Sequence, residues 1–296
     1  MISVFTPTYN RGSLISRVYE SLERQTNKDF EWIIVDDGST DDTENIVAAF
    51  QEMATFPIAY KKKCNEGKHV AINVGSTMAN GEWFFIVDSD DTLTPDAIEK
   101  IEFYCDEIKY DTSFSGVVGL RRNAKGEAWT KWYSGGGTTE NVVSDKYLDA
   151  TCLEYRYKYR IQGDRAEVVR TELLKKYPFP QYDNEKFLVE SYLWLSLAKD
   201  GYKFRWFNDV IYITEYLEDG LTQNISKHYR NSPRGSCAVA NLRLSCKGVP
   251  LMERVKNTYY FFKYGRIAKE RWRNLIKECN CRRLIPVGIL LALIKP

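Results

Sequence analysis

Histidine is almost absent from this chain, and its cysteines follow no pattern of a metal site or a disulfide framework. Two histidines and seven cysteines occur among 296 residues. Cys279 and Cys281 stand too close together for the usual pair of zinc ligands, and no histidine follows them. We therefore expect no structural zinc and interpret the cysteines as the reduced thiols of a cytoplasmic protein.

The sequence also lacks a long hydrophobic run. Its longest apolar stretch, residues 284–294, has eleven residues, whereas a membrane-spanning helix needs roughly 18 or more. The first ten residues hold neither a basic segment nor an apolar core, so they do not resemble a signal peptide. We expect a cytoplasmic protein that does not cross the membrane.

Three common motifs of nucleotide enzymes and hydrolases are missing. The chain contains no G-x-G-x-x-G, no P-loop G-x-x-x-x-G-K-[ST] and no G-x-S-x-G. Their absence weighs against dinucleotide enzymes, P-loop nucleotidases and α/β-hydrolases. Neither histidine belongs to a recognisable catalytic triad, so any active site should be built on carboxylates.

What is present is an ordinary globular composition with an uneven distribution of charge. Apolar residues make up 44% and charged residues 28%, which excludes long disorder, collagen and coiled coil. The net charge of +2 argues against a dedicated nucleic-acid binder. Residues 251–296 hold eleven basic and three acidic side chains and so carry +8, which leaves −6 on residues 1–250.

Short apolar runs alternate with helical periodicity in the first third of the chain. This alternation predicts a Rossmann-like α/β domain, in which right-handed crossovers connect parallel strands. The runs at 30–35 and 83–87 are almost wholly apolar, as expected for strands covered on both faces. We expect strands at 2–6, 30–35, 58–61 and 83–87, and helices at 14–22, 42–51, 71–78 and 95–104.

After residue 106 the predicted strands are shorter, and from residue 226 the chain is helical, basic and aromatic. We therefore divide the chain into an α/β domain, residues 1–225, and a C-terminal helical extension, residues 226–296. The domain itself has two halves, 1–105 and 106–225. Its second half should contain strands at 116–120, 128–133, 165–170, 204–207 and 210–214, with a helix at 190–199.

Three of the predicted strands are followed by polar motifs. These are Thr8-Tyr9-Asn10-Arg11, Asp36-Asp37-Gly38 and Asp88-Ser89-Asp90-Asp91. Because ligands of open α/β sheets bind beyond the carboxyl ends of the strands, the three motifs should face one crevice.

Asp88 and Asp90 are suited to a divalent cation. Alternation along an extended backbone places them on one side, and a hard cation relieves the repulsion between two such carboxylates. A solvated turn is the alternative interpretation. Asp36 or Asp37 can accept hydrogen bonds from a base or ribose, although Asp-Gly is also a favoured turn. Lys68, near a helix start, suits a phosphate or nucleobase, although a lone lysine is often a surface residue.

Four segments, in this order and spacing, resemble family 2 glycosyltransferases, which are inverting enzymes with the GT-A nucleotide-sugar fold. The resemblance is close over residues 1–105, continues more weakly to about 225 and points to bacterial polysaccharide-type members. It implies a mostly parallel central sheet flanked by helices, with residues 1–105 binding the nucleotide sugar and 106–225 the acceptor. The segments are residues 4–11, 34–41, 65–73 and 87–91.

The resemblance also implies a donor site and a metal site. Asp90 would be the main ligand of Mn²⁺ or Mg²⁺, and Asp88 would assist it while contacting the ribose or the donor sugar. Asp36 or Asp37 would hold a uracil or thymine base. The other implied donor-binding residues are Thr6, Pro7, Thr8, Tyr9, Lys68, Ser89 and Asp91.

An inverting transfer needs one general base for the acceptor hydroxyl. We expect Glu190 in this role, because it begins a helix containing Trp194, as in the family. The family often has a second acidic residue here, where this chain has Ser191. A loop at 216–222 resembles one that closes over donor and acceptor. The other candidate bases are Asp164, Asp183, Glu185, Glu218 and Asp219.

The basic, aromatic segment 254–283 allows three interpretations. In the first, its aromatic side chains pack on the core of the domain. In the second, residues 251–296 lie on an anionic membrane surface. In the third, the segment binds nucleic acid. The last is disfavoured, because no nucleic-acid-binding module is recognisable. We expect no nucleic-acid partner and a peripheral position on the inner face of the cell membrane.

The expected function is transfer of a sugar, from a UDP-sugar, to a glycan or lipid-linked acceptor in cell-surface polysaccharide synthesis. One alternative is a sugar-nucleotide nucleotidyltransferase, which would need a glycine-rich loop that residues 6–11 lack. The other is a non-catalytic scaffold that binds sugar nucleotides.

Overall fold

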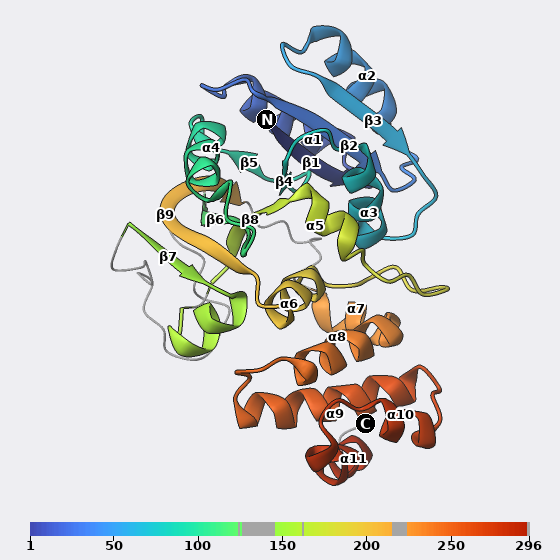
Figure 1. The fold of residues 1–296 in the computed structure, drawn as a ribbon. Coiled ribbons are helices and arrows are strands. Elements are labelled where there is room, and N and C mark those ends of the chain that lie inside the picture. The colour runs from blue at the N-terminus through green and yellow to red at the C-terminus, as the bar shows by residue number, and fades with distance from the viewer. Residues whose placement is uncertain (124, 126–145, 162, 215–223, 295–296) are drawn as a thin grey trace.

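The computed structural model describes residues 1–123, 125, 146–161, 163–214 and 224–294. Nine strands of this described part form one sheet in the order β3-β2-β1-β4-β8-β6-β9-β5, with β7 also paired to β9 (Figure 1). The strands are β1 (Ile2–Thr8), β2 (Phe30–Asp36), β3 (Ile58–Lys62), β4 (Trp83–Ile86), β5 (Thr92–Leu93), β6 (Phe114–Asn123), β7 (Tyr147–Ala150), β8 (Arg165–Arg170) and β9 (Lys203–Thr214).

Among the described strands, most run in one direction, as predicted for a mostly parallel sheet, and β5, β7 and β8 run against them. β1 pairs in parallel with both β2 and β4, and β2 pairs in parallel with β3. β8 runs antiparallel between β4 and β6, and β6 is parallel to β9. The carboxyl ends of β1, β2, β4 and β6 therefore meet at one edge, together with the beginning of β8.

Helices cover both faces of the sheet because its strands are apolar on both sides. In β1, Val4 faces one apolar core with α1, α2 and α4, whereas Phe5 faces a second core with α3, α5 and α6. This three-layer arrangement confirms the predicted α/β class. The helices are α1 (Gly12–Glu23), α2 (Thr43–Met53), α3 (Lys68–Met78), α4 (Ala97–Ile108), α5 (Thr171–Lys176) and α6 (Ser191–Lys199).

Several details differ from the sequence-based expectations. The strands expected at 204–207 and 210–214 form one strand, β9, whose pairing with β6 shifts register and so interrupts the apolar pattern. β5, β7, α5 and a π-helical turn (Glu154–Lys158) were not predicted, because elements of two to six residues carry little periodicity. The strand expected at 128–133 lies outside the described residues.

Residues 225–294 form a stack of helices below α6, at the end of the molecule opposite β3 and α2 (Figure 1). Phe261 and Phe262 are buried in a third apolar core made by these helices. In the described ranges we find no helix that is long and apolar enough to cross a membrane. The elements are α7 (Ile225–Asn231), α8 (Pro233–Ser245), α9 (Leu251–Ile267), α10 (Trp272–Glu278), η2 (Arg282–Leu284) and α11 (Ile285–Ile294).

Candidate active site

The three polar motifs lie at the same edge of the sheet. Thr8, the last residue of β1, pairs with Asp36, the last residue of β2. The Asp88–Asp91 run follows β4, the other neighbour of β1. The parallel order thus brings Thr8 and Asp88, which are 80 residues apart in the chain, to the same edge of the sheet.

Both carboxylates of the Asp36-Asp37 motif are engaged inside the protein. Asp36 is fully buried and accepts hydrogen bonds from the Ser39 N–H (2.7 Å) and the Tyr60 hydroxyl (2.8 Å). Asp37 accepts a bond from the Gly67 N–H (2.7 Å) and pairs with Lys63 (2.7 Å). These contacts hold the loop before α3 against the end of β2. They shape this part of the edge, and direct contact of either carboxylate with a nucleotide base stays a prediction.

The end of β1 presents one buried hydroxyl and one exposed ring. Thr6 points into the core, where its Oγ1 accepts a hydrogen bond from the Trp32 indole (2.9 Å). Thr8 Oγ1 is buried and has no hydrogen-bond partner among the described residues. Tyr9 is 47% exposed at the same end. An unpartnered buried hydroxyl beside an exposed aromatic ring suits a bound ligand, whereas Thr6 supports the strand from behind.

Tyr212 of β9 holds the acidic run that follows β4. The Tyr212 hydroxyl accepts a hydrogen bond from the Asp88 N–H (2.9 Å) and donates one to Asp91 Oδ2 (2.8 Å). The Arg121 guanidinium lies 4.1 Å from the centre of the Tyr212 ring. Burial and the charge of Asp88 raise the pKa of Asp91 to about 7. Asp91 therefore fixes the turn from inside rather than standing open at the edge.

Lys68 joins the two halves of the domain. Its Nζ lies 2.5 Å from Asp88 Oδ1 and 2.6 Å from Glu190 Oε1. Burial opposes the charged ammonium, but the two carboxylates outweigh it and raise the pKa of Lys68. The preceding Gly67 has φ 100°, and a Cβ there would lie 2.0 Å from the Lys186 carbonyl oxygen. Only glycine allows this approach, which holds the segment before Glu190 against the start of α3.

Asp88 and Asp90 have the chemistry of a site for a divalent cation. Burial and the charge of Asp88 raise the pKa of Asp90, so the pair is electrostatically unfavourable without a cation. No group of three or more His, Cys, Asp or Glu side chains in the described ranges is arranged to hold a metal. Carboxylate oxygens are the ligands that Mg²⁺ and Mn²⁺ prefer, with phosphates and water completing the shell, and the role of Asp88 and Asp90 as metal ligands stays a prediction.

Sequence reasoning missed Glu167 on β8. In this strand Ala166 and Val168 face the core with α1 and α4, so Glu167 faces the side covered by α3 and α6, as Val169 does. Burial, with the charges of Glu190 and Asp164, raises the pKa of Glu167 to about 7 against the opposing effect of Arg121. A glutamate between Ala166 and Val168, within the apolar centre of the strand, was the available signal.

Glu190 differs from the other acidic residues that were considered as bases. Glu185 accepts hydrogen bonds from the N–H groups of Arg234 and Gly235 (both 2.9 Å) and so caps α8. Asp164 and Asp183 are exposed. Among these four candidates, Glu190 alone is joined to Lys68 and hence to the acidic run. Glu218, Asp219 and the 216–222 loop lie outside the described residues.

Solved structures define the class of this fold. Staphylococcus aureus TarS matches 99% of this chain and 53% of its own with a TM-score of 0.60 at 20% identity. The mannosyltransferase PcManGT from Pyrobaculum calidifontis matches 100% of this chain and 88% of its own with a TM-score of 0.58 at 15% identity. The fold is the GT-A fold of glycosyltransferases, as expected.

The sequence comparisons identify the family. The model of glycosyl transferase family 2 matches residues 3–167, and the chain belongs to this family. An uncharacterised glycosyltransferase of Mycoplasma pneumoniae is 38% identical over 114 residues, 37% of this chain and 38% of that protein. Chondroitin synthase of Escherichia coli is 36% identical over 124 residues, 42% of this chain and 17% of that protein. The chain thus spans well under half the length of these relatives.

Proposed function

We propose that the protein is an inverting glycosyltransferase that moves a sugar from a nucleoside-diphosphate sugar to an acceptor hydroxyl. The observation that carries this proposal is the Lys68 bridge, which sets Glu190 beside the Asp88–Asp91 run at the ligand edge of a GT-A sheet. Solved relatives support the donor class. One TarS structure contains UDP-GlcNAc, and the PcManGT structure contains GDP-Man and Mn²⁺. A UDP-sugar is the proposed donor.

The donor is proposed to lie across the carboxyl ends of β1, β2 and β4. The nucleotide would stack against Tyr9 and bond to Thr8, on the loop shaped by Asp36 and Asp37. Asp88 and Asp90 would hold Mn²⁺ or Mg²⁺, which, when bound, stabilises the negative charge of the departing diphosphate. The ammonium of Lys68 adds positive charge on the same side.

Glu190 is the proposed general base. A single in-line displacement inverts the anomeric carbon and releases one proton from the acceptor hydroxyl. The Glu190 carboxylate would take this proton, and Lys68 would keep it oriented until the acceptor arrives. Glu167, on the same face of the sheet, is the proposed second acidic group, in place of the one the family often has at position 191.

The acceptor is proposed to be a glycan or a lipid-linked saccharide, used in cell-surface polysaccharide synthesis at the inner face of the membrane. Residues 106–225 are proposed to bind it, because Glu167 and Glu190 both come from this half. The 226–296 extension would then serve attachment rather than catalysis.

A donor screen tests the proposal. The full chain is heated with UDP-, dTDP- and GDP-sugars, with and without Mn²⁺, and the shift in melting temperature is measured. We expect one nucleotide class to stabilise the protein and Mn²⁺ to increase the shift. A protein that binds sugar nucleotides without any cation effect and transfers no sugar would instead be a scaffold, and the proposal would fail.

A further inference from the structure

Helix α11 packs through one face only. Gly288 lies so close to Thr258 and Phe262 of α9 that a Cβ would come within 2.9 Å of both side chains. The neighbouring inward residues join the same C-terminal apolar core. They are Ile285, Ile289 and Ala292. The helix is therefore fixed firmly on α9, with a defined outer face.

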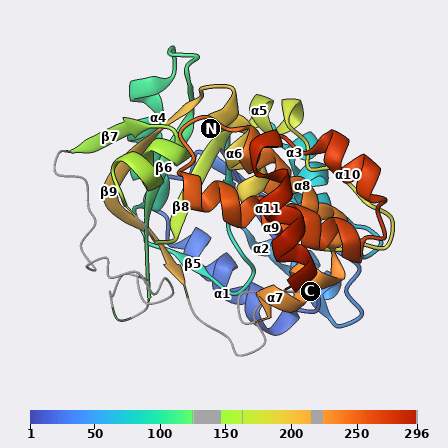
Figure 2. The ribbon, with the colours of Figure 1, turned by 90° about the horizontal axis from the view of Figure 1, so that it is seen from below.

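That outer face is apolar and open to solvent. Val287, Leu290, Leu293 and Ile294 are 40%, 57%, 65% and 64% exposed. Their spacing of three or four residues puts them on one stripe, and the helix has no charged residue. Leaving four large apolar side chains in water is unfavourable, so a contiguous stripe of this kind marks a contact surface. Figure 2 shows α11 on the side of the molecule that faces away from the sheet.

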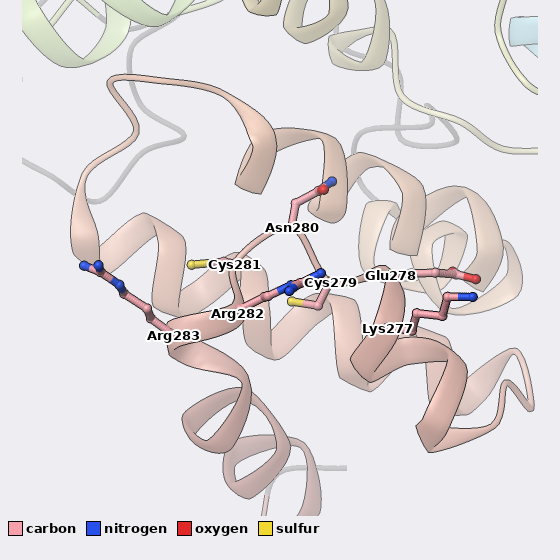
Figure 3. Close-up of a pocket in the computed structure, with 7 residues that line it drawn as sticks. All are labelled: Lys277, Glu278, Cys279, Asn280, Cys281, Arg282 and Arg283. Atoms are coloured by element: carbon pink, nitrogen blue, oxygen red, sulfur yellow. The ribbon is translucent and has the colours of Figure 1, made fainter.

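A basic turn, residues 277–283, precedes this helix, and we call it the basic elbow. The turn between α10 and α11 borders an open hollow of about 410 Å³, lined by residues 277–283. Lys277, Arg282 and Arg283 are its exposed basic lining residues, and Glu278 is the one acidic lining residue (Figure 3). Arg282 and Arg283 lie in η2, the short helix that leads directly into α11. Cationic and apolar side chains therefore meet at the beginning of α11.

We propose that α11 and this elbow form a docking surface for an anionic phospholipid bilayer. The outer stripe would enter the boundary of the acyl chains, and the three basic side chains would meet lipid phosphates. The ten residues Ile285–Ile294 extend about 15 Å along the helix axis, and the proposed contact is made by the outer side of this segment. The +8 charge of residues 251–296 favours the same partner.

Charge also argues against a second copy of the chain as the occupant. A dimer formed through this stripe would bring together two 251–296 segments that each carry +8, and like charges would repel. An anionic bilayer supplies an apolar interior and negative phosphates together. The biological role of this docking rests on the proposed function, since a lipid-linked acceptor lies in the membrane. Binding to vesicles, however, can be measured without any sugar transfer.

Cosedimentation of the full chain with vesicles tests the docking surface. The probes are phosphatidylcholine vesicles with or without about 30% phosphatidylglycerol. We expect binding to the anionic vesicles that weakens at high salt. Leu290→Glu with Leu293→Glu, and separately Arg282→Ser with Arg283→Ser, should each reduce the binding at least about tenfold. A matched control, Met53→Glu with Tyr110→Glu, removes exposed apolar side chains from the catalytic domain and should bind as the native protein does.

Three results would overturn the inference. They are failure of the native chain to bind anionic vesicles, equal binding by neutral vesicles, and unchanged binding by the α11 variants. A concentration-dependent dimer that is lost in the same variants, without vesicle binding, would identify a second copy as the partner. Circular dichroism melting of each variant separates loss of docking from unfolding. Transfer to a soluble acceptor, measured in parallel, tests the proposed function separately.

Discussion

Lys68 Nζ lies 2.6 Å from Glu190 Oε1, so that an ion pair joins the 1–105 and 106–225 segments of the chain. The same ammonium lies 2.5 Å from Asp88 Oδ1. One cation thus contacts both the acidic run proposed to hold the metal and the carboxylate proposed to act as base. This arrangement would connect the proposed donor site with the position of the proposed base.

Replacing Lys68 with methionine should impair transfer and stability together. Asp88 and Glu190 would face each other without a cation, and we expect kcat to fall by roughly 10²-fold and the free energy of unfolding by about 1–3 kcal/mol. Steady-state kinetics and urea unfolding measure the two effects. Lys61→Met, which removes an exposed lysine, is the control. Native values of both quantities in the Lys68 variant would show that the bridge has no role.

Replacing Glu190 with glutamine should lower kcat by roughly 10²–10⁴-fold and leave donor affinity nearly unchanged, because the amide cannot accept the proton. Glu185→Ala is the matched control. It removes the cap of α8 and should cost about 1 kcal/mol of stability while kcat stays native. Loss of donor binding in the Glu190 variant would point to a structural role instead.

Glu167 should make acceptor binding depend on pH near neutrality. Its pKa of about 7 means that it becomes ionised as the pH rises through 7. If its carboxylate accepts a hydrogen bond from the acceptor, the acceptor KM should fall over that range, and Glu167→Gln should remove the dependence. The raised pKa also predicts that ionisation weakens the fold, so this variant should melt higher than the native protein at pH 8 but not at pH 4. An unchanged pH profile in the variant would contradict the assignment.

His69 should reduce stability in mild acid. It is 2% exposed, and burial lowers its pKa to about 4, below the unfolded value of about 6.5. The unfolded chain therefore takes up a proton that the folded chain does not, so stability is lost as the pH falls from 6.5 to 4, by at most about 3 kcal/mol. His69→Phe should flatten this part of the profile in urea unfolding at several pH values. Equal slopes for the two proteins would exclude His69 as the cause.

The first half of the fold was predictable because its signals are local. Strands β1, β2 and β4 are short, largely apolar runs, and a polar motif lies at the end of each, so a parallel sheet brings the motifs to one edge. Glu190 and Lys68, each singled out separately from the sequence, lie side by side in the structure. Their catalytic and binding roles stay predictions.

The remaining features depend on contacts that the sequence does not encode locally. The position of β8 between β4 and β6 is set by pairing across long separations, and so Glu167 went unnoticed. The motif did not show that Asp37 bonds to the backbone of Gly67, or that Thr6 faces the Trp32 indole. In the C-terminal extension, the mixed basic and aromatic pattern did not reveal that Phe262 is buried.

The most direct measurement is sugar transfer as a function of Mn²⁺ concentration, for the native chain and Asp90→Ala. Removing this carboxylate takes away the main proposed ligand of the cation, so the account predicts metal-dependent transfer by the native protein and none by the variant. Asp96→Ala, which removes an aspartate paired with Lys100 at the surface, should behave as the native protein does. Full metal-dependent activity in the Asp90 variant would contradict the account.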